Sequence, residues 1–315
     1  MPCFHEPVML KEVLDFLQPQ SGKTYIDCTV GGGGHALEIV KRILPDGRLI
    51  GLDRDEEALI AAAECLSEYR ENVILEKANY ADLEAVMERL GVRSADGALL
   101  DLGVSSRQLE SPERGFSFRH DSDLDMRMDR SDRVTAKEIV NAWSERRLSE
   151  VIWTYGEERW AKRIAKFIVE RRSRRPIRTT RELAEIILAA VPAGARTERI
   201  HPATKSFQAI RIAVNREIES LQAGLDAGIS LLAPGGRVCV LSYHSLEDRV
   251  VKETFARHAG RCTCPSGLPI CVCGAKKSIR ILTKRPLTPT DEEVRVNPRS
   301  RSAKLRAAEK LPNQV

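Results

Sequence analysis

The chain lacks a long apolar run and an N-terminal segment of the kind that directs secretion. No stretch approaches the roughly 18 unbroken apolar residues that a membrane span needs. Glu6 stands near the N-terminus, where a signal peptide would begin its apolar core. We therefore expect a cytoplasmic protein that makes no membrane contact. Because thiols stay reduced in that compartment, we do not expect the eight cysteines to form a disulfide framework.

The sequence also lacks the Gly-x-Ser-x-Gly turn that presents the nucleophile of many serine hydrolases. His244, Ser245 and Asp248 do occur close together. A serine and an acid beside a histidine are common by chance, however, so we do not interpret these residues as a hydrolytic triad.

The chain has only a small excess of positive charge, because 50 Lys and Arg against 45 Asp and Glu give a net charge of +5. The excess is concentrated in residues 276–310, where eleven cations against four acids give a net +7. Such a basic tail suits a polyanion and predicts contact with nucleic acid. With 315 residues and 42% hydrophobic content, the chain can bury a large core in one or two domains.

Four of the cysteines form a cluster, and these are Cys262, Cys264, Cys271 and Cys273. Four thiolates in one loop could enclose a tetrahedral zinc ion. The Cys-x-Cys spacing is tighter than the usual gap within a ligand pair, which favours a reduced, loop-stabilising cluster. We therefore expect no metal and keep zinc as the alternative.

A glycine-rich turn between a short apolar strand and a helical pattern is the most informative motif. Residues 24–30 lead into four glycines, Gly31 to Gly34, and Asp53 follows a second strand predicted at 48–52. Glycine permits positive φ and lets the backbone approach a ligand closely. An acid at the end of the second strand can accept hydrogen bonds from ribose hydroxyls. This pattern predicts that the first half of the chain binds a nucleoside-bearing cofactor.

Strand and helix patterns continue to alternate along this half. Further strands are predicted at 72–76, 97–103 and 236–242, and helices at 37–44, 56–69 and 82–90. The alternation predicts an α/β fold with a doubly wound, parallel sheet. Ligands of such sheets bind outside the carboxyl ends of the strands, where we expect Asp101 and His244 to line one cleft beside the glycine loop.

The alternation stops after Ser106, and no strand is predicted before residue 236. Residues 108–133 are polar and irregular. Apolar residues then recur at helical spacing over 136–143, 148–155, 158–172 and 180–190. We therefore expect an all-helical insert at 108–213 within a sheet domain formed by 1–107 and 214–315.

The insert carries three tryptophans and two groups of cations. Trp143, Trp153 and Trp160 fall at helical spacings and are expected to lie in the core. The cations within 171–175 and 205–216 could bind phosphates together with the basic tail.

Seven motifs follow one another along nearly the whole chain. They are HEPVML (5–10), DCTVGGGGH (27–35), DLGVSS (101–106), RGFSF (114–118), HPAT (201–204), FQAIRIAVN (207–215) and SYHSLEDR (242–249). In this combination the chain closely resembles the RsmH (MraW) family. The resemblance implies an S-adenosyl-L-methionine-dependent methyltransferase that modifies the exocyclic N4 amine of a cytidine in 16S ribosomal RNA. It also implies a class I methyltransferase sheet, Rossmann-like, with a helical insert for substrate recognition, and an RNA partner within the small ribosomal subunit.

The resemblance further implies a set of cofactor-binding residues: Gly33, Gly34, His35, Asp53, Tyr80, Asp101 and Gln108. Asp101 is in addition our candidate for accepting the proton of the target amine, a role that competes with cofactor binding alone. His244 is the second candidate for a proton acceptor or base-positioning group. Residues 297–306 are assigned either to RNA contact or to closure of the sheet.

Two other functions are compatible with parts of the sequence. Gly31-x-Gly33-x-x-Ala36 satisfies the dinucleotide fingerprint of nicotinamide-dependent oxidoreductases. The helical insert, the basic tail and the absence of an identifiable substrate-reducing site argue against that function. An RNA-binding protein without activity is the other alternative, and it predicts nucleic-acid affinity without methyl incorporation.

Overall fold

The structure is a computed structural model and describes residues 7–196, 201–262, 264 and 276–312. The chain forms two compact units. Residues 1–103 and 218–315 make up the first unit, which contains the sheet, and residues 104–217 make up the second. These limits lie close to the boundaries of 108 and 213 that the sequence indicates for the insert.

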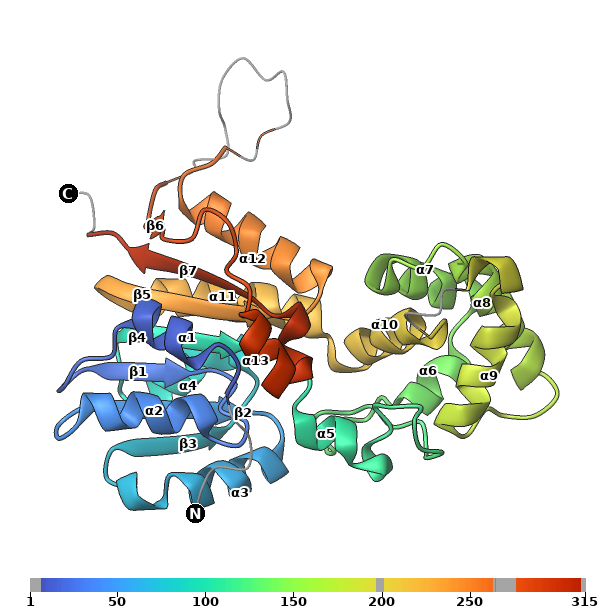
Figure 1. Cartoon of the computed structure of the whole chain (residues 1–315), viewed down its shortest axis with the longest axis horizontal. Helices are drawn as coiled ribbons and strands as arrows, with labels where there is room; N and C mark the ends of the chain where they lie inside the picture. The colour runs from blue at the N-terminus through green and yellow to red at the C-terminus, as the bar shows by residue number, and fades with distance from the viewer. Residues whose placement is uncertain (1–6, 197–200, 263, 265–275, 313–315) are drawn as a thin grey trace. The chain divides into compact units, whose positions relative to one another are not determined.

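A seven-stranded sheet organises the first unit (Figure 1). Its strands are β1 (Thr24–Asp27), β2 (Arg48–Asp53), β3 (Val73–Lys77), β4 (Ala95–Asp101), β5 (Leu232–Ser242), β6 (Ile279–Ile281) and β7 (Lys304–Lys310). Their spatial order is β3-β2-β1-β4-β5-β7-β6. Strands β1 to β5 are parallel, whereas β7 runs antiparallel to both β5 and β6. The expected doubly wound α/β sheet is confirmed.

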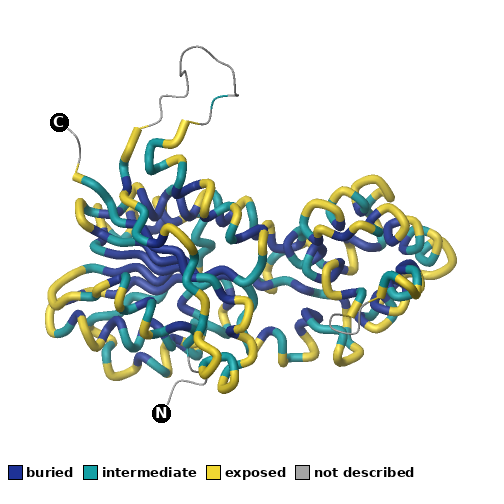
Figure 2. The backbone as a smooth tube through the Cα atoms, turned by 45° about the horizontal axis from the view of Figure 1, so that its top comes forward, coloured by how far each residue is buried: buried dark blue, intermediate teal, exposed yellow. Residues whose placement is uncertain are grey.

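Helices cover both faces of this sheet. They are α1 (Leu10–Leu17), α2 (Gly34–Ile43), α3 (Glu56–Cys65), α4 (Leu83–Arg89), α11 (Glu217–Leu231) and α12 (Ser245–His258). A further short helix, α13 (Asp291–Val296), buries none of its residues. Neighbouring residues of β2 point to opposite faces, so Leu49 packs in the core with α1 and α2, and Ile50 in the core with α4 and α11. Burial on both faces explains why the central strands are almost continuously apolar, and Figure 2 shows them as a buried layer.

The C-terminal segment closes the sheet. The cations of β7 and its neighbours have partners within the chain: Arg306 Nε lies 2.6 Å from Asp248 Oδ1, and Arg280 Nη2 lies 2.8 Å from Glu309 Oε1. Of the two roles expected for residues 297–306, sheet closure is therefore observed for Lys304–Arg306. Contact of the remaining basic residues with nucleic acid stays a prediction.

The second unit is helical in its described part. Its helices are α5 (Ser106–Glu110), α6 (Ala136–Ala142), α7 (Glu145–Gly156), α8 (Ala161–Arg172), α9 (Thr180–Ala190) and α10 (Ala203–Asn215). Threonine or serine side chains cap the N-termini of α6, α7 and α9. Apolar residues of α6 to α10 share one core.

Two buried polar side chains hold the irregular segment before α6. The guanidinium of Arg114 donates hydrogen bonds to the carbonyl oxygens of Arg127 and Met128 at 3.1 and 2.8 Å. Asn215 accepts from the Met128 N–H and donates to the Met126 carbonyl, both at 2.8 Å. These bonds satisfy backbone groups that no strand or helix pairs, so Arg114 and Asn215 have a structural role within their motifs.

The expectation that all three tryptophans lie in the core is wrong for Trp153, which is 62% exposed. Trp143 and Trp160 pack against the core as expected. Helix α7 buries Leu148, Ile152 and Gly156, which recur every four residues. Trp153 follows Ile152 directly, so the rotation of about 100° per residue carries it off the buried face.

A search of the described residues for membrane-spanning helices is negative: none of their helices is both long and apolar enough to cross a bilayer.

Candidate functional site

Three aspartates end three adjacent parallel strands, namely Asp27 of β1, Asp53 of β2 and Asp101 of β4. The carboxylate of Asp53 accepts hydrogen bonds from the backbone N–H groups of Gly31 and Asp55 at 3.0 and 2.8 Å. Asp27 accepts one from the N–H of Thr29 at 3.1 Å. The aspartates are therefore fixed at the carboxyl edge of the sheet, where ligands of such folds bind.

The three carboxyl groups hold their protons more tightly than usual. Burial, together with smaller contributions from the charges of Asp101 and Asp53, raises the pKa of Asp27 to about 7. Burial likewise raises the pKa of Asp53 to about 6, and it raises the pKa of Asp101. An acidic cluster that repels its own charges favours a positively charged ligand.

The glycine loop runs beside this cluster. Gly31 and Gly33 have φ of 52° and 86°, in the left-handed region that favours glycine. A Cβ on Gly33 would lie 3.2 Å from Cys65 Sγ, whereas a Cβ on Gly32 would meet nothing within 4 Å. Gly34 then begins α2, whose N-terminus has no side-chain cap and no acid in its first turn. The loop therefore presents open backbone and a helix N-terminus that favours an anionic group.

His35 joins the loop to Asp101 and is almost fully buried. Its Nε2 lies 2.9 Å from the carbonyl oxygen of Val8, and its Nδ1 lies 3.6 Å from Asp101 Oδ2. A carbonyl oxygen can only accept a hydrogen bond, so we assign a proton to Nε2. Nδ1 faces the carboxylate of Asp101.

Tyr243 is a site residue that the sequence analysis missed. Its hydroxyl donates a 2.8 Å hydrogen bond to Asp101 Oδ1, and the N–H of Asp101 donates to Thr29 Oγ1 at 2.6 Å. Asp101 is thus fixed by Thr29, which follows β1, and by Tyr243, which follows β5. Its Oδ2 is directed toward His35. The available signal was the place of Tyr243 directly after a predicted strand, beside His244.

His244 caps helix α12. Its Nδ1 accepts a hydrogen bond from the N–H of Glu247 at 3.3 Å, and its Nε2 lies 3.1 Å from Glu247 Oε1. The Glu247 carboxylate in turn accepts from the N–H of Tyr243 at 2.8 Å. Because Nδ1 already accepts the hydrogen bond from Glu247, this geometry favours a role of His244 in positioning the start of α12. A role of His244 as proton acceptor stays a prediction.

Tyr80 begins a short 3-10 helix (Tyr80–Asp82) after β3. Asn79 caps that helix, accepting from the N–H of Ala81 at 3.0 Å, and donates to Ser220 at 3.1 Å. Gly224 of α11 packs so closely on Tyr80 that a Cβ there would lie 2.5 Å from the ring. The half-buried ring is therefore fixed near the edge where the adenine is expected.

Gln108 lies in the second unit, at the start of α5. Its side chain accepts from the N–H of Ser105 at 3.0 Å, and Ser105 Oγ accepts from the N–H of Gln108 at 3.1 Å. This reciprocal pair is a capping box. A contact between Gln108 and the cofactor stays a prediction.

The structure bears on part of what was expected of the cysteines. Cys262 is exposed, and its Sγ lies 3.4 Å from the N–H of Cys264. Cys271 and Cys273 lie outside the described residues, so a four-thiolate zinc site stays an alternative. Cys65 is disulfide-bonded, so the expectation of reduced thiols does not hold for it.

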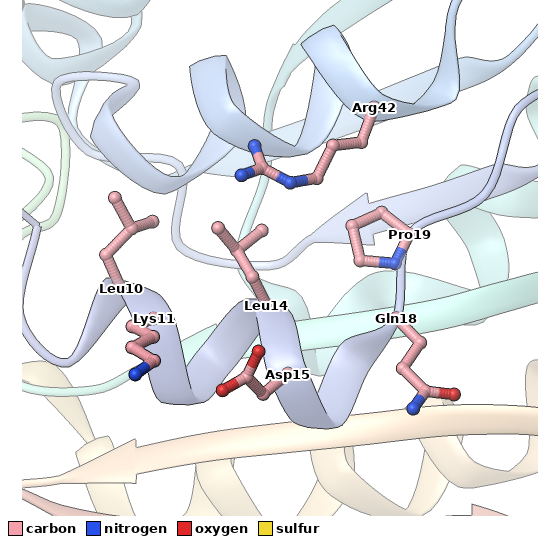
Figure 3. Close-up of a pocket in the computed structure, with 7 residues that line it drawn as sticks. All are labelled: Leu10, Lys11, Leu14, Asp15, Gln18, Pro19 and Arg42. Atoms are coloured by element: carbon pink, nitrogen blue, oxygen red, sulfur yellow. The ribbon is translucent and has the colours of Figure 1, made fainter.

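A groove on the first unit is separate from these residues. Figure 3 shows its lining, which comprises Leu10, Lys11, Leu14, Asp15, Gln18, Pro19 and Arg42. None of the candidate site residues belongs to this set, and we assign the groove no part in the site.

Known proteins resemble this chain over almost its full length. The MraW methylase family matches residues 2–311. A protein of Symbiobacterium thermophilum named ribosomal RNA small subunit methyltransferase H is 55% identical over 99% of this chain and 98% of its own length. Proteins of the same name from Pelobacter propionicus and Geotalea uraniireducens are 55% and 53% identical, each over 98% of both chains. The family resemblance is confirmed, and the chain belongs to the MraW methylase family.

Proposed function

We propose that this protein transfers a methyl group from S-adenosylmethionine to the exocyclic N4 amine of a cytidine in 16S ribosomal RNA. Family membership supports methyl transfer, and the name of the relatives, ribosomal RNA small subunit methyltransferase H, supports ribosomal RNA as the substrate class. The observation that carries the choice of cofactor is the acidic cluster of Asp27, Asp53 and Asp101.

The residues at the sheet edge fit this cofactor. S-adenosylmethionine supplies a methyl group on a positively charged sulfonium, and the acidic cluster favours such a charge. A nicotinamide dinucleotide would instead bring an anionic pyrophosphate toward the same carboxylates, which argues against the oxidoreductase alternative. The open N-terminus of α2, beginning at Gly34, would hold the cofactor's carboxylate, and Asp53 would accept from the ribose hydroxyls.

Asp101 is the residue that we expect to act on the target amine. The lone pair of cytosine's exocyclic nitrogen is delocalised into the ring, so an acceptor that orients the amine and takes its proton accelerates the attack. Tyr243 occupies Asp101 Oδ1, which leaves Oδ2 for this purpose. Burial raises the pKa of Asp101, and a higher pKa makes the carboxylate a better proton acceptor.

The target base has to leave its stack to reach a carboxylate at the edge of the sheet. RNA is recognised mainly through loop shape, stacking and 2′-hydroxyl contacts. A small ribosomal subunit, which presents a structured loop, therefore suits this chain better as a substrate than a short oligonucleotide does.

A direct test is to incubate the purified protein with labelled methyl donor and small subunits from cells that lack the activity. We expect label in a single 16S nucleoside that migrates as N4-methylcytidine. Binding of subunits without incorporation would instead support the inactive RNA-binding alternative. Label on another atom or another RNA would contradict the proposed specificity.

The affinity for the cofactor is expected to fall as the pH drops through about 6. The ionised carboxylate of Asp53 can accept hydrogen bonds from ribose with both oxygens, whereas protonation weakens it as an acceptor, and burial raises its pKa to about 6. Below this value one proton must be released on binding, which weakens affinity about tenfold per pH unit. Calorimetric titration with S-adenosylhomocysteine between pH 5 and 8 measures this dependence.

Asp53→Asn should bind more weakly at pH 8 and lose the dependence near pH 6. Asp15→Asn removes an exposed acid of α1 and serves as the control, with an unchanged profile. An Asp53→Asn protein with the wild-type pH profile would show that another group is responsible.

A further inference from the structure

Cations gather where helix α8 of the second unit begins. Arg159, Lys162 and Arg163 are exposed, and we call these three residues the α8 strip. The buried side of α8 is formed by Ala161, Ile164, Ala165 and Ile168. The strip therefore lies outside the core, and its side chains are available to solvent.

The α8 strip has no acidic partner within the described residues. Two of the cations that the sequence indicated for phosphate binding, Arg172 and Arg211, are occupied within the unit. Arg172 donates to the carbonyl oxygens of Val140 and Trp143 at 2.7 and 2.6 Å, and Arg211 pairs with Glu217 at 2.8 Å. The strip is thus a better candidate for an external anion than these residues are.

Aromatic rings hold the two arginines of the strip. The guanidinium carbon of Arg159 lies 5.0 Å from the ring centre of Trp160, and that of Arg163 lies 5.3 Å from that of Phe167. These distances are within the range of cation–π attraction. Stacking orders a guanidinium without using its N–H donors, which remain free for the oxygens of a phosphate.

The position of the strip is unfavourable for the helix itself. Positive charge in the first turn of a helix opposes the macrodipole, and Lys162 and Arg163 stand in that turn. Helices α6, α7 and α9 follow the usual preference, with Glu138, Glu145 and Glu182 in their first turns. Helix α8 has no acid there. The strip is therefore a local cost to folding, as is typical of residues that serve binding.

We propose that the α8 strip binds the phosphate backbone of the substrate RNA. The inference rests on the proposed function for the identity of the RNA. Like-charged side chains that carry free donors match closely spaced phosphates, and such contacts position an RNA without reading its sequence. The strip is thus an affinity surface of the second unit, separate from the chemistry at the edge of the sheet.

The test compares two triple variants of the full chain. Arg159→Gln, Lys162→Gln and Arg163→Gln together remove the strip. Lys137→Gln, Arg146→Gln and Arg175→Gln remove three exposed cations elsewhere in the same unit, of which Arg146 and Arg175 pair with acids. Because all six residues are exposed, both proteins should fold, and the strip variant should melt no lower than the wild type. A third protein, with Arg159→Lys and Arg163→Lys, keeps the charge.

The readout is binding to a 16S ribosomal RNA transcript at 50 to 200 mM salt. The strip variant should bind at least about tenfold more weakly at 50 mM, with a slope of log affinity against log salt that is smaller by about 2, because three phosphate contacts are lost. The control variant should stay within about threefold of wild type, and the lysine variant should retain most of the affinity. A strip variant that binds like the control variant, with the wild-type salt slope, would overturn the proposal.

Methyl incorporation, measured in parallel, separates this proposal from the proposed function. The strip variant should show a raised KM for small subunits, an unchanged kcat and an unchanged affinity for S-adenosylhomocysteine. If the wild type incorporates no methyl group but the strip still governs RNA affinity, the proposed reaction is wrong and the RNA surface stands. If the wild type methylates and the strip variant has an unchanged KM, the RNA surface is wrong.

Discussion

Asp101→Asn is expected to lower the rate of methyl transfer by about 10²- to 10⁴-fold, the usual contribution of a positioned general base. The amide keeps the size of the carboxylate and can still accept from Tyr243, but it cannot take a proton from the target amine. Single-turnover transfer of labelled methyl to small subunits measures the rate. Affinity for S-adenosylhomocysteine, measured separately by calorimetry, reports on the competing role in cofactor binding.

Asp96→Asn is the matched control, because Asp96 lies near the other end of the same strand and accepts from the N–H of Thr24 at 3.0 Å. Its rate of transfer should be unchanged. If Asp101→Asn loses cofactor affinity but transfers methyl groups normally at saturation, Asp101 is a cofactor ligand alone. A variant that binds normally and turns over normally would exclude both roles.

Asp27→Asn is expected to raise the free energy of unfolding by about 2–4 kcal/mol at pH 8. Burial raises the pKa of Asp27 to about 7, whereas in the unfolded chain it lies near 4. The folded state therefore binds the proton more tightly, so the wild type loses stability as the pH rises from about 4 to about 7. At pH 8 the buried carboxylate is mostly ionised, and asparagine removes this cost while keeping an acceptor for the N–H of Thr29.

Urea denaturation of both proteins at pH 8 and pH 5 measures the effect. The gain should shrink to roughly 1 kcal/mol at pH 5, where the folded wild type is already protonated. Asp46→Asn, which replaces an exposed acid, should change stability by less than about 0.5 kcal/mol at either pH. An Asp27→Asn protein that is less stable than wild type at pH 8 would show that the ionised carboxylate is favourable.

The sheet and its site edge were predictable because local patterns determine them. Apolar runs ending in Asp53 and Asp101 mark strands whose carboxyl ends carry acids, and parallel strands bring those ends together. The contact between Tyr243 and Asp101 was not predictable, since 142 positions separate the two residues and neither has a local signal for the other.

Which of the basic residues have partners inside the chain could not be predicted for a related reason. A run of arginines such as 171–175 looks available in the sequence, yet Arg172 is tied to two carbonyl oxygens across the core. Whether a cation is free depends on tertiary partners that composition does not reveal. Trp153 fails similarly, because one step of helical rotation separates an exposed side chain from a buried one.

The position of β7 between β5 and β6 has a consequence for how this protein is made. Synthesis proceeds from the N-terminus, so an emerging chain already carries β5 with one side unpaired, and the strand that covers it is supplied later by residues 304–310. Until then the nascent chain exposes a bare edge that can pair with other chains. An early stop before residue 304 would make that exposure permanent.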